Sequence, residues 1–324
     1  MKIQNRFAIG CLVQWYEINM IEEYIASVKQ ALKQIENPQD IIVDFTFTTN
    51  QKLEKIDTNK AEINSLRFKF QNMVKDFDID VEWRVTDDLV TIADYRRWFN
   101  DFYCDKVDVL MWGESDSLIP KQTFEVLDLL HTNNVNQNVH KYVTFFGGCK
   151  MWDDSWKPIE HTDFTDKPFI EGDTDNWWSL RYTMSLEEMN EINDKVEELD
   201  VRIVNPYKFN GCGLVISSDV VKSGVNIPKS VFFVHEDTAF MHSLMKTFDG
   251  KIPQFVIKNM LLVHNRKHPN KRSYVLGEEG LDKTNTGELR KAHSWYENAN
   301  KMCEHNAYNM FNQSKTYTWE DVFK

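Results

Sequence analysis

The sequence predicts an α/β fold with a mostly parallel central sheet and helices on both faces, and two features of the chain support this prediction. Short apolar runs, typical of buried strands, alternate with longer segments whose apolar residues recur at helical spacing. Each crossover between strands is also long enough to hold a helix, as parallel pairing requires. The chain has 324 residues, of which 42% are hydrophobic, and this is sufficient for one large domain.

The first unit of the chain reads as strand, helix and strand. Residues 7–13 form an apolar run, and apolar side chains then recur at helical spacing between residues 18 and 32. Asn37 and Pro38 end this helix, and residues 41–48 are rich in β-branched and aromatic side chains, which favour a strand. A helix between two strands predicts that the strands pair in parallel.

The same alternation continues up to residue 146. We expect helices over residues 60–77 and 91–103 and after Pro120, and strands over residues 81–85, 107–112 and 142–146. In open α/β sheets, ligands bind beyond the carboxyl ends of the strands, so residues that directly follow a strand are candidates for function.

The regular alternation lapses between residues 151 and 210. One clear helix remains there, and it begins at Ser185 with Glu188 in the position that completes a capping box. The segment also holds four tryptophans, whose rings either stack on sugars or bases or fill a small satellite core. These are Trp152, Trp156, Trp177 and Trp178.

The end of the chain completes the sheet and adds an extension. Residues 211–218 and 254–264 are strand-like, and a polar stretch from residue 277 leads to a predicted helix over about residues 287–311. We therefore divide the chain into a main domain, residues 1–276, with the insertion at about 151–210, and a C-terminal helical extension, residues 277–324.

The composition limits the classes of protein to which the chain can belong. Its formal net charge is −12, so a broad basic surface for nucleic acid is not evident. The sequence contains no run of about 18 apolar residues and no signal-peptide pattern, so we expect a cytoplasmic protein. The five cysteines are scattered singly and predict reduced, mostly buried thiols.

One basic cluster stands out in this acidic chain. Residues 264–272 (HNRKHPNKR) contain two histidines and four basic side chains, Arg266 and Lys267 among them. Such a cluster suits a phosphate group, and it is equally typical of a solvated surface loop.

Two carboxylates follow the predicted strand over residues 107–112. Glu114 and Asp116 stand two positions apart, so their side chains point to the same side of an extended backbone. Carboxylates at this spacing suit Mg²⁺ or Mn²⁺, which prefer oxygen ligands and keep open positions for a substrate. An acidic turn can also produce the same spacing by chance.

A second acidic pair and a histidine come later in the chain. Glu236 and Asp237 follow an apolar run and precede a predicted helix, where the helix dipole by itself favours acidic residues. His264 ends the last predicted strand and is either a ligand or an ordinary polar residue. The order of these features along an alternating α/β chain indicates a shared site.

In that order, the motifs resemble those of a GT-A-fold glycosyltransferase, and the chain is most similar to the family 2 group over roughly residues 7–268. Residues 114–116 (ESD) match the family's DxD motif with Glu in place of the first Asp, and Pro120 follows. Residues 236–237 match the ED motif, NGCGLVISSDV matches the Gly-rich strand, and LLVH matches the closing strand with its histidine. The resemblance implies a GT-A-like, Rossmann-type sheet with its aromatic-rich insertion on the acceptor side.

The resemblance also implies a reaction and the residues that carry it. A sugar would move from a nucleoside diphosphate to an acceptor hydroxyl, with Asp116, Glu114 and His264 holding a divalent metal, Mn²⁺ or Mg²⁺. Asp237, in the ED motif with Glu236, would accept the hydroxyl proton and give inversion. The donor would contact Trp15 or Tyr16 at its base, Asp44 or residues 46–50 at the base edge, and Arg97 or Arg96 with Arg266 and Lys267 at the diphosphate.

The acceptor that the resemblance implies is a saccharide or glycoconjugate, and the alternative is a hydroxymethylated base in DNA. The basic cluster and the tryptophans permit DNA, whereas the net charge of −12 weighs against it. A nucleotidyltransferase would normally carry a Gly-rich phosphate loop after the first strand, and residues 13–20 contain no glycine. A glycoside hydrolase would place its two carboxylates on either side of the bond that it cleaves and would not need the basic cluster. A non-catalytic sugar-binding protein of the same fold is a further alternative.

Overall fold

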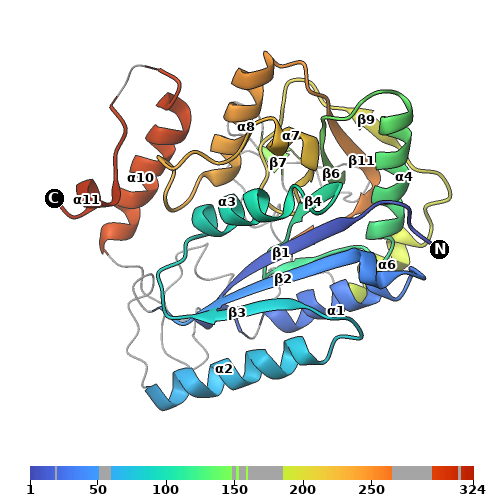
Figure 1. The fold of residues 1–324 in the computed structure, drawn as a ribbon, viewed down its shortest axis with the longest axis horizontal. Helices are drawn as coiled ribbons and strands as arrows, with labels where there is room; N and C mark the ends of the chain where they lie inside the picture. The colour runs from blue at the N-terminus through green and yellow to red at the C-terminus, as the bar shows by residue number, and fades with distance from the viewer. Residues whose placement is uncertain are drawn as a thin grey trace.

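The computed structural model describes residues 1–18, 20–50, 60–147, 151–152, 158–159, 185–264, 294–312 and 315–324. Its centre is an eight-stranded sheet with the strand order β3-β2-β1-β4-β10-β6-β11-β9 (Figure 1). The strands are β1 (Phe7–Gln14), β2 (Ile41–Thr48), β3 (Glu82–Thr86), β4 (Val109–Trp112), β6 (Val143–Gly147), β9 (Val201–Ile203), β10 (Val215–Ser217) and β11 (Gln254–Leu261).

The pairing within this sheet is mostly parallel, which confirms the predicted fold class. β1 pairs in parallel with β2 and β4, β2 with β3, and β6 with β11. β10 runs antiparallel to both of its neighbours, and β9 runs antiparallel to β11. The carboxyl ends of β1, β2, β3 and β4 therefore lie at one edge of the sheet.

Helices cover both faces of the sheet, as predicted (Figure 1). One hydrophobic core joins the sheet to α1 (Ile21–Leu32), α2 (Lys60–Lys75) and α4 (Thr123–Asn136), and a second joins it to α3 (Ile92–Tyr103), α7 (Ser218–Lys222) and α8 (Glu236–Phe248). Because successive side chains of a strand point to opposite faces, β1 contributes to both cores. Phe7, Ile9, Cys11 and Val13 belong to the first core, and Ala8 and Leu12 belong to the second.

Helix α3, which carries Arg96 and Arg97, lies very close to β1. A Cβ atom at Gly10 would lie 2.4 Å from the Phe99 ring and 2.6 Å from Tyr95 Oη. Glycine at this position therefore lets α3 rest directly on the sheet. Thr91 caps the helix, since its Oγ1 accepts a hydrogen bond from the Asp94 amide at 3.1 Å.

The predicted insertion is only partly described, and its residues from 185 onward pack onto the main sheet. Helix α6 (Leu186–Asn193) has the expected capping box, and Asn193 exchanges two hydrogen bonds with the backbone of Leu261 in β11. β9 was missed because its three residues are exposed at the sheet edge and follow no apolar pattern. The short strands β7 (Met151–Trp152) and β8 (Pro158–Ile159) form a separate pair, while Trp156, Trp177 and Trp178 lie outside the described residues.

The C-terminal region packs onto the main domain through α10 (Ser294–Asn309) and α11 (Trp319–Val322). Helix α10 lies beside α8 (Figure 1), and its Ala299 and Cys303 share a small core with Phe232 and Phe233 from the loop before α8. The predicted helix over 287–311 is described from residue 294 onward.

Two expectations from composition can be compared with the described part of the chain. Cys11, Cys104, Cys212 and Cys303 are buried thiols, as predicted, and Cys149 lies outside the described residues. None of the helices in the described ranges combines the length and the apolarity that crossing a lipid bilayer requires.

Candidate active site

The first acidic motif lies in a tight turn directly after β4. The Gly113 amide donates to Gly10 O at 2.7 Å, which fastens the start of this turn to β1. Further along, the amide and the hydroxyl of Ser117 both donate to Glu114 O, at 3.1 and 2.9 Å. Glu114 is partly exposed and Asp116 is buried at this carboxyl edge of the sheet.

The backbone brings His264 to the same turn. The two-residue strands β5 (Ser117–Leu118) and β12 (Val263–His264) pair antiparallel, with His264 opposite Ser117. His264 is therefore a neighbour of Asp116 in space, although 148 positions separate the two in the sequence. Its side chain lies outside the description, and among the described residues no three or more Asp, Glu, His or Cys side chains gather as a metal-binding group.

Arg96 joins the first acidic motif to the second. This residue of α3 is 2% exposed, and its Nη2 donates to Glu114 Oε1 at 2.8 Å while its Nη1 forms an ion pair with Glu236 Oε1. The guanidinium carbon lies 4.7 Å from the centroid of the Trp112 ring at the end of β4. One buried cation thus holds carboxylates from two segments that are 122 residues apart.

The Gly-rich segment before β10 provides the space for this arginine. A Cβ atom at Gly211 would lie 2.5 Å from Arg96 Nη1 and 3.4 Å from the Cβ atom of Asp237. Any larger residue at position 211 would displace the guanidinium group. Three motifs that the sequence singled out separately therefore meet around Arg96: residues 114–116, residues 236–237 and the Gly-rich segment.

The two carboxylates of the second motif have different surroundings. Glu236, the first residue of α8, is buried against Arg96, whereas Asp237 is partly exposed. Asp237 Oδ1 accepts a hydrogen bond from the Thr238 amide at 2.7 Å. This contact orients the Asp237 carboxylate at the helix N-terminus, where the helix dipole also stabilises its negative charge.

Burial raises the pKa of the Glu236 carboxyl to about 7; Arg96 opposes the rise, and the neighbouring Asp237 adds to it. Because the folded protein holds this proton more tightly than the unfolded chain, the stability of the wild type should fall as the pH rises from about 5 to 8. We expect the fall to exceed that of Glu236→Gln by about 2–3 kcal/mol. Urea unfolding of both proteins across this range measures the difference, and parallel stability curves would contradict the assignment.

Arg97, expected at the diphosphate, points elsewhere. Its guanidinium donates to three backbone carbonyls of the loop before α8, those of Ile227, Pro228 and Val231, at 2.8, 3.0 and 2.6 Å. It also pairs with Asp94 at 2.9 Å. The residue of α3 that reaches the two acidic motifs is therefore Arg96, and Arg97 secures the loop.

Asp44, expected at the base edge, is an interior residue of β2. It lies four residues before the carboxyl end of the strand, and its side chain is 1% exposed. Its two oxygens accept hydrogen bonds from Arg84, Tyr95 and Tyr103 at 2.7–2.8 Å. Burial raises the pKa of the Asp44 carboxyl, and these three donors oppose the rise. The structure therefore places Asp44 inside the fold, where it joins β2 to β3 and α3.

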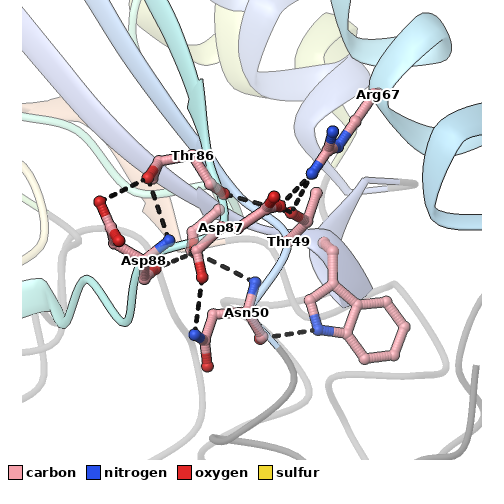
Figure 2. Close-up of polar contacts among 8 residues, drawn as sticks. Thr49, Asn50, Arg67, Thr86, Asp87 and Asp88 are labelled. Carbon is pink, nitrogen blue, oxygen red and sulfur yellow. Dashed lines mark hydrogen bonds and ion pairs between the residues drawn. The ribbon is translucent and has the colours of Figure 1, made fainter. Parts of the chain in front are cut away.

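Polar residues gather where β2 and β3 end, and Figure 2 shows how they face one another. We call this group the β2–β3 end cluster; it consists of Thr49, Asn50, Arg67, Thr86, Asp87 and Asp88. The Thr49 amide donates to Thr86 O at 2.9 Å, and Asn50 Nδ2 donates to Asp87 O at 2.8 Å. Arg67, from α2, donates to Thr49 Oγ1 at 3.1 Å and forms an ion pair with Asp87, whose side chain is 74% exposed.

Trp15 supports this cluster from the hydrophobic core. Its ring is fully buried in the core, and its Nε1 donates to Asn50 O at 3.2 Å. Trp15 therefore helps to fix the position of Asn50, and its buried ring presents no exposed surface on which a base could stack. The side chain of Tyr16, the other expected base contact, lies outside the description, as do Arg266 and Lys267.

Sequence reasoning included Thr49 and Asn50 in the expected strip over residues 46–50 but missed Arg67, Asp87 and Asp88. A signal for the two acids was present, because Asp87 and Asp88 directly follow β3 as Glu114 and Asp116 follow β4. Arg67 had no such signal, since it reaches the cluster only through the packing of α2.

The comparisons with known proteins give likenesses of fold. No family model and no curated protein matches the chain. Among solved structures, the chain is similar to TarS (1–349) from S. aureus, with 12% identity and a TM-score of 0.42 over 84% of this chain and 63% of that chain. The chain thus spans less than two thirds of that structure.

Two further structures have the same degree of likeness. A UDP-glucose pyrophosphorylase complexed with UDP-glucose has 7% identity and a TM-score of 0.36, over 78% of this chain and 90% of that chain. A putative glucose-1-phosphate thymidylyltransferase from Bacillus anthracis has 10% identity and a TM-score of 0.39, over 84% and 96%. At these identities the likenesses identify no family. The fold and the site define an α/β protein with an acidic centre at the carboxyl edge of a mostly parallel sheet.

Proposed function

We propose that the protein is a metal-dependent glycosyltransferase that moves a sugar from a nucleoside diphosphate to an acceptor hydroxyl with inversion. The observation that carries this proposal is the pairing of Arg96 with both Glu114 and Glu236. It brings a partly exposed carboxylate, Asp237, beside the acidic turn that follows β4. An acidic turn that suits a metal and a separate, partly exposed carboxylate that can act as a base are the groups that this transfer needs, and the buried cation Arg96 holds the two segments together.

The donor diphosphate would lie at the turn over residues 114–117. Asp116 and Glu114, with His264 beside them through the backbone pairing, would hold the metal. Two carboxylates fit Mg²⁺ or Mn²⁺, because these ions complete their coordination with waters and substrate phosphates. A bound ion of this kind would neutralise the negative charge on the departing diphosphate.

The base of the donor would lie at the β2–β3 end cluster. The exposed carboxylate of Asp87 accepts hydrogen bonds, and the Asn50 carboxamide both donates and accepts, as reading the edge of a base requires. The cluster follows β2 and β3, and the acidic turn follows β4, so both lie at the same edge of the sheet. One nucleoside diphosphate could then extend along this edge.

Asp237 would act as the general base. As the acceptor oxygen bonds to the anomeric carbon and the bond to the diphosphate breaks, Asp237 takes the hydroxyl proton and the nucleoside diphosphate leaves. Glu236 stays with Arg96 and orients the motif. The acceptor we favour is a saccharide or glycoconjugate, because the net charge of −12 opposes binding to DNA.

A screen of nucleotide sugars for donor hydrolysis with Mn²⁺ or Mg²⁺ tests the proposal. Asp116→Asn, which keeps the size of the side chain, is expected to lower this activity on the order of 10³-fold, because metal-assisted charge stabilisation contributes several kcal/mol. Asp105→Asn, an exposed residue before β4, is the matched control and should retain full activity. Full activity in Asp116→Asn would reject the metal assignment, and no turnover of any donor by the wild type would reject the function.

A further inference from the structure

The loop over residues 226–235 leads directly into the acidic pair at the start of α8, and α3 holds this loop from one side. Arg97 donates to the carbonyls of Ile227, Pro228 and Val231. Thr91, the cap of α3, donates through its hydroxyl to Phe232 O at 2.9 Å. This side of the loop is therefore fixed by the helix that carries Arg96.

The C-terminal region holds the same loop from the other side. Asn306 of α10 donates to Ser230 O at 2.7 Å, and the Phe232 ring lies 4.8 Å from that of Trp319 in α11. Asn306 also exchanges hydrogen bonds with the backbone of Tyr317, which ties α10 to the chain leading into α11. The loop thus lies between α3 and α10, two helices that are far apart in the sequence (Figure 1).

The last residue of the loop, His235, has an unfavourable backbone conformation. Its φ and ψ are 65° and 26°, the left-handed region, which a residue with a Cβ atom adopts only when its surroundings enforce it. His235 Nε2 lies 3.1 Å from Asn300 Oδ1 on α10, a distance at which the protonated nitrogen donates to that oxygen. This turn sets the direction in which Glu236 and Asp237 leave the loop.

We propose that α10 is a positioning element for the catalytic pair, and that Asn300 acts through His235 to orient Asp237. The inference rests on the proposed function for the role of Asp237. The contacts give it a physical basis: the hydrogen bond that His235 donates to Asn300 restrains the residue whose left-handed backbone leads into α8. Without that bond, Asp237 loses its fixed orientation while the donor site at the other strand ends stays intact.

The experiment compares three variants of the full chain on α10. Asn300→Leu is expected to lower kcat about 5- to 10-fold, the effect of one hydrogen bond, and to leave KM for the donor within about twofold. Asn300→Asp keeps an acceptor oxygen and should retain most of kcat. Asn298→Leu changes the same residue type at an exposed position of the same helix and should behave as the wild type.

A double-variant cycle and hydrogen exchange complete the test. His235→Gly keeps the left-handed backbone but removes the contact, so combining it with Asn300→Leu should cost no more than either change alone. Exchange of the backbone amides over residues 234–239 should rise in Asn300→Leu and not in Asn298→Leu, a readout that needs no activity. The inference would be overturned if hydrogen exchange were equal in the two leucine variants, or if the decreases in kcat of His235→Gly and Asn300→Leu multiplied in the double variant. A change in KM for the donor without a change in kcat would also overturn it. A wild type without glycosyl transfer overturns the proposed function alone.

Discussion

Asp237→Asn is expected to lower kcat by roughly 10²–10⁴-fold and to leave KM for the donor nearly unchanged. Asparagine keeps the size of the side chain and can still accept from the Thr238 amide at its oxygen, but it cannot take up the acceptor proton. Asp237 is the partly exposed member of the pair, whereas Glu236 is buried against Arg96. The measurement is steady-state transfer with the preferred donor at saturating acceptor.

The matched control lies at the other end of the same helix. Asp249 follows α8, is exposed, and has a left-handed backbone that asparagine also adopts readily, so Asp249→Asn should leave kcat unchanged. Donor binding, measured by calorimetry without acceptor, should be equal in both variants. An unchanged kcat in Asp237→Asn would exclude Asp237 as the base.

Arg96→Leu is expected to destabilise the protein by about 3–5 kcal/mol and to abolish transfer. The arginine is 2% exposed and compensates Glu236, which is buried, and Glu114, which is partly buried. Removing one partner of a buried ion pair leaves an uncompensated charge in the interior, which is strongly unfavourable. Urea unfolding at pH 8, above the pKa of Glu236, measures the loss of stability, and transfer activity is measured well below the unfolding midpoint.

Two further variants distinguish the loss of the buried ion pair from the general effect of replacing an arginine. Arg202→Leu removes an exposed ion pair with Asp200 and should cost less than about 1 kcal/mol. Adding Glu236→Gln to Arg96→Leu removes the carboxyl that Arg96 compensates, and at pH 8, above the pKa of Glu236, it should recover part of the lost stability. If Arg96→Leu costs no more than Arg202→Leu, the buried ion pair does not stabilise the site.

The strands and helices were predictable because their patterns are local. The strand over residues 41–48 was predicted with its observed bounds, and α3 was predicted to within one residue at its start. The same prediction already placed Asp44 in the middle of a strand, so its interior role could have been inferred from the strand itself. The exposed edge strand β9 was missed because its residues show no burial pattern.

Local sequence patterns could not decide whether Arg96 or Arg97 reaches the acidic motifs. Consecutive residues of a helix point about 100° apart, so one of the two faces the sheet and the other does not. Which one faces the acidic motifs depends on how α3 packs onto β1 at Gly10, and that contact joins residues far apart in the sequence. The β2–β3 end cluster likewise depends on the packing of α2, which brings Arg67 to Asp87.

The chain's own pattern was enough to specify an α/β protein with acidic motifs after β4 and at the start of α8, because periodicity and turn residues act over a few positions. Long-range packing alone established that these motifs meet at Arg96, that Gly211 makes room for the guanidinium, and that α10 holds the loop before Asp237. The physical reason is that a buried charge is stable only beside its partners, and the fold brings those partners together from distant segments of the sequence.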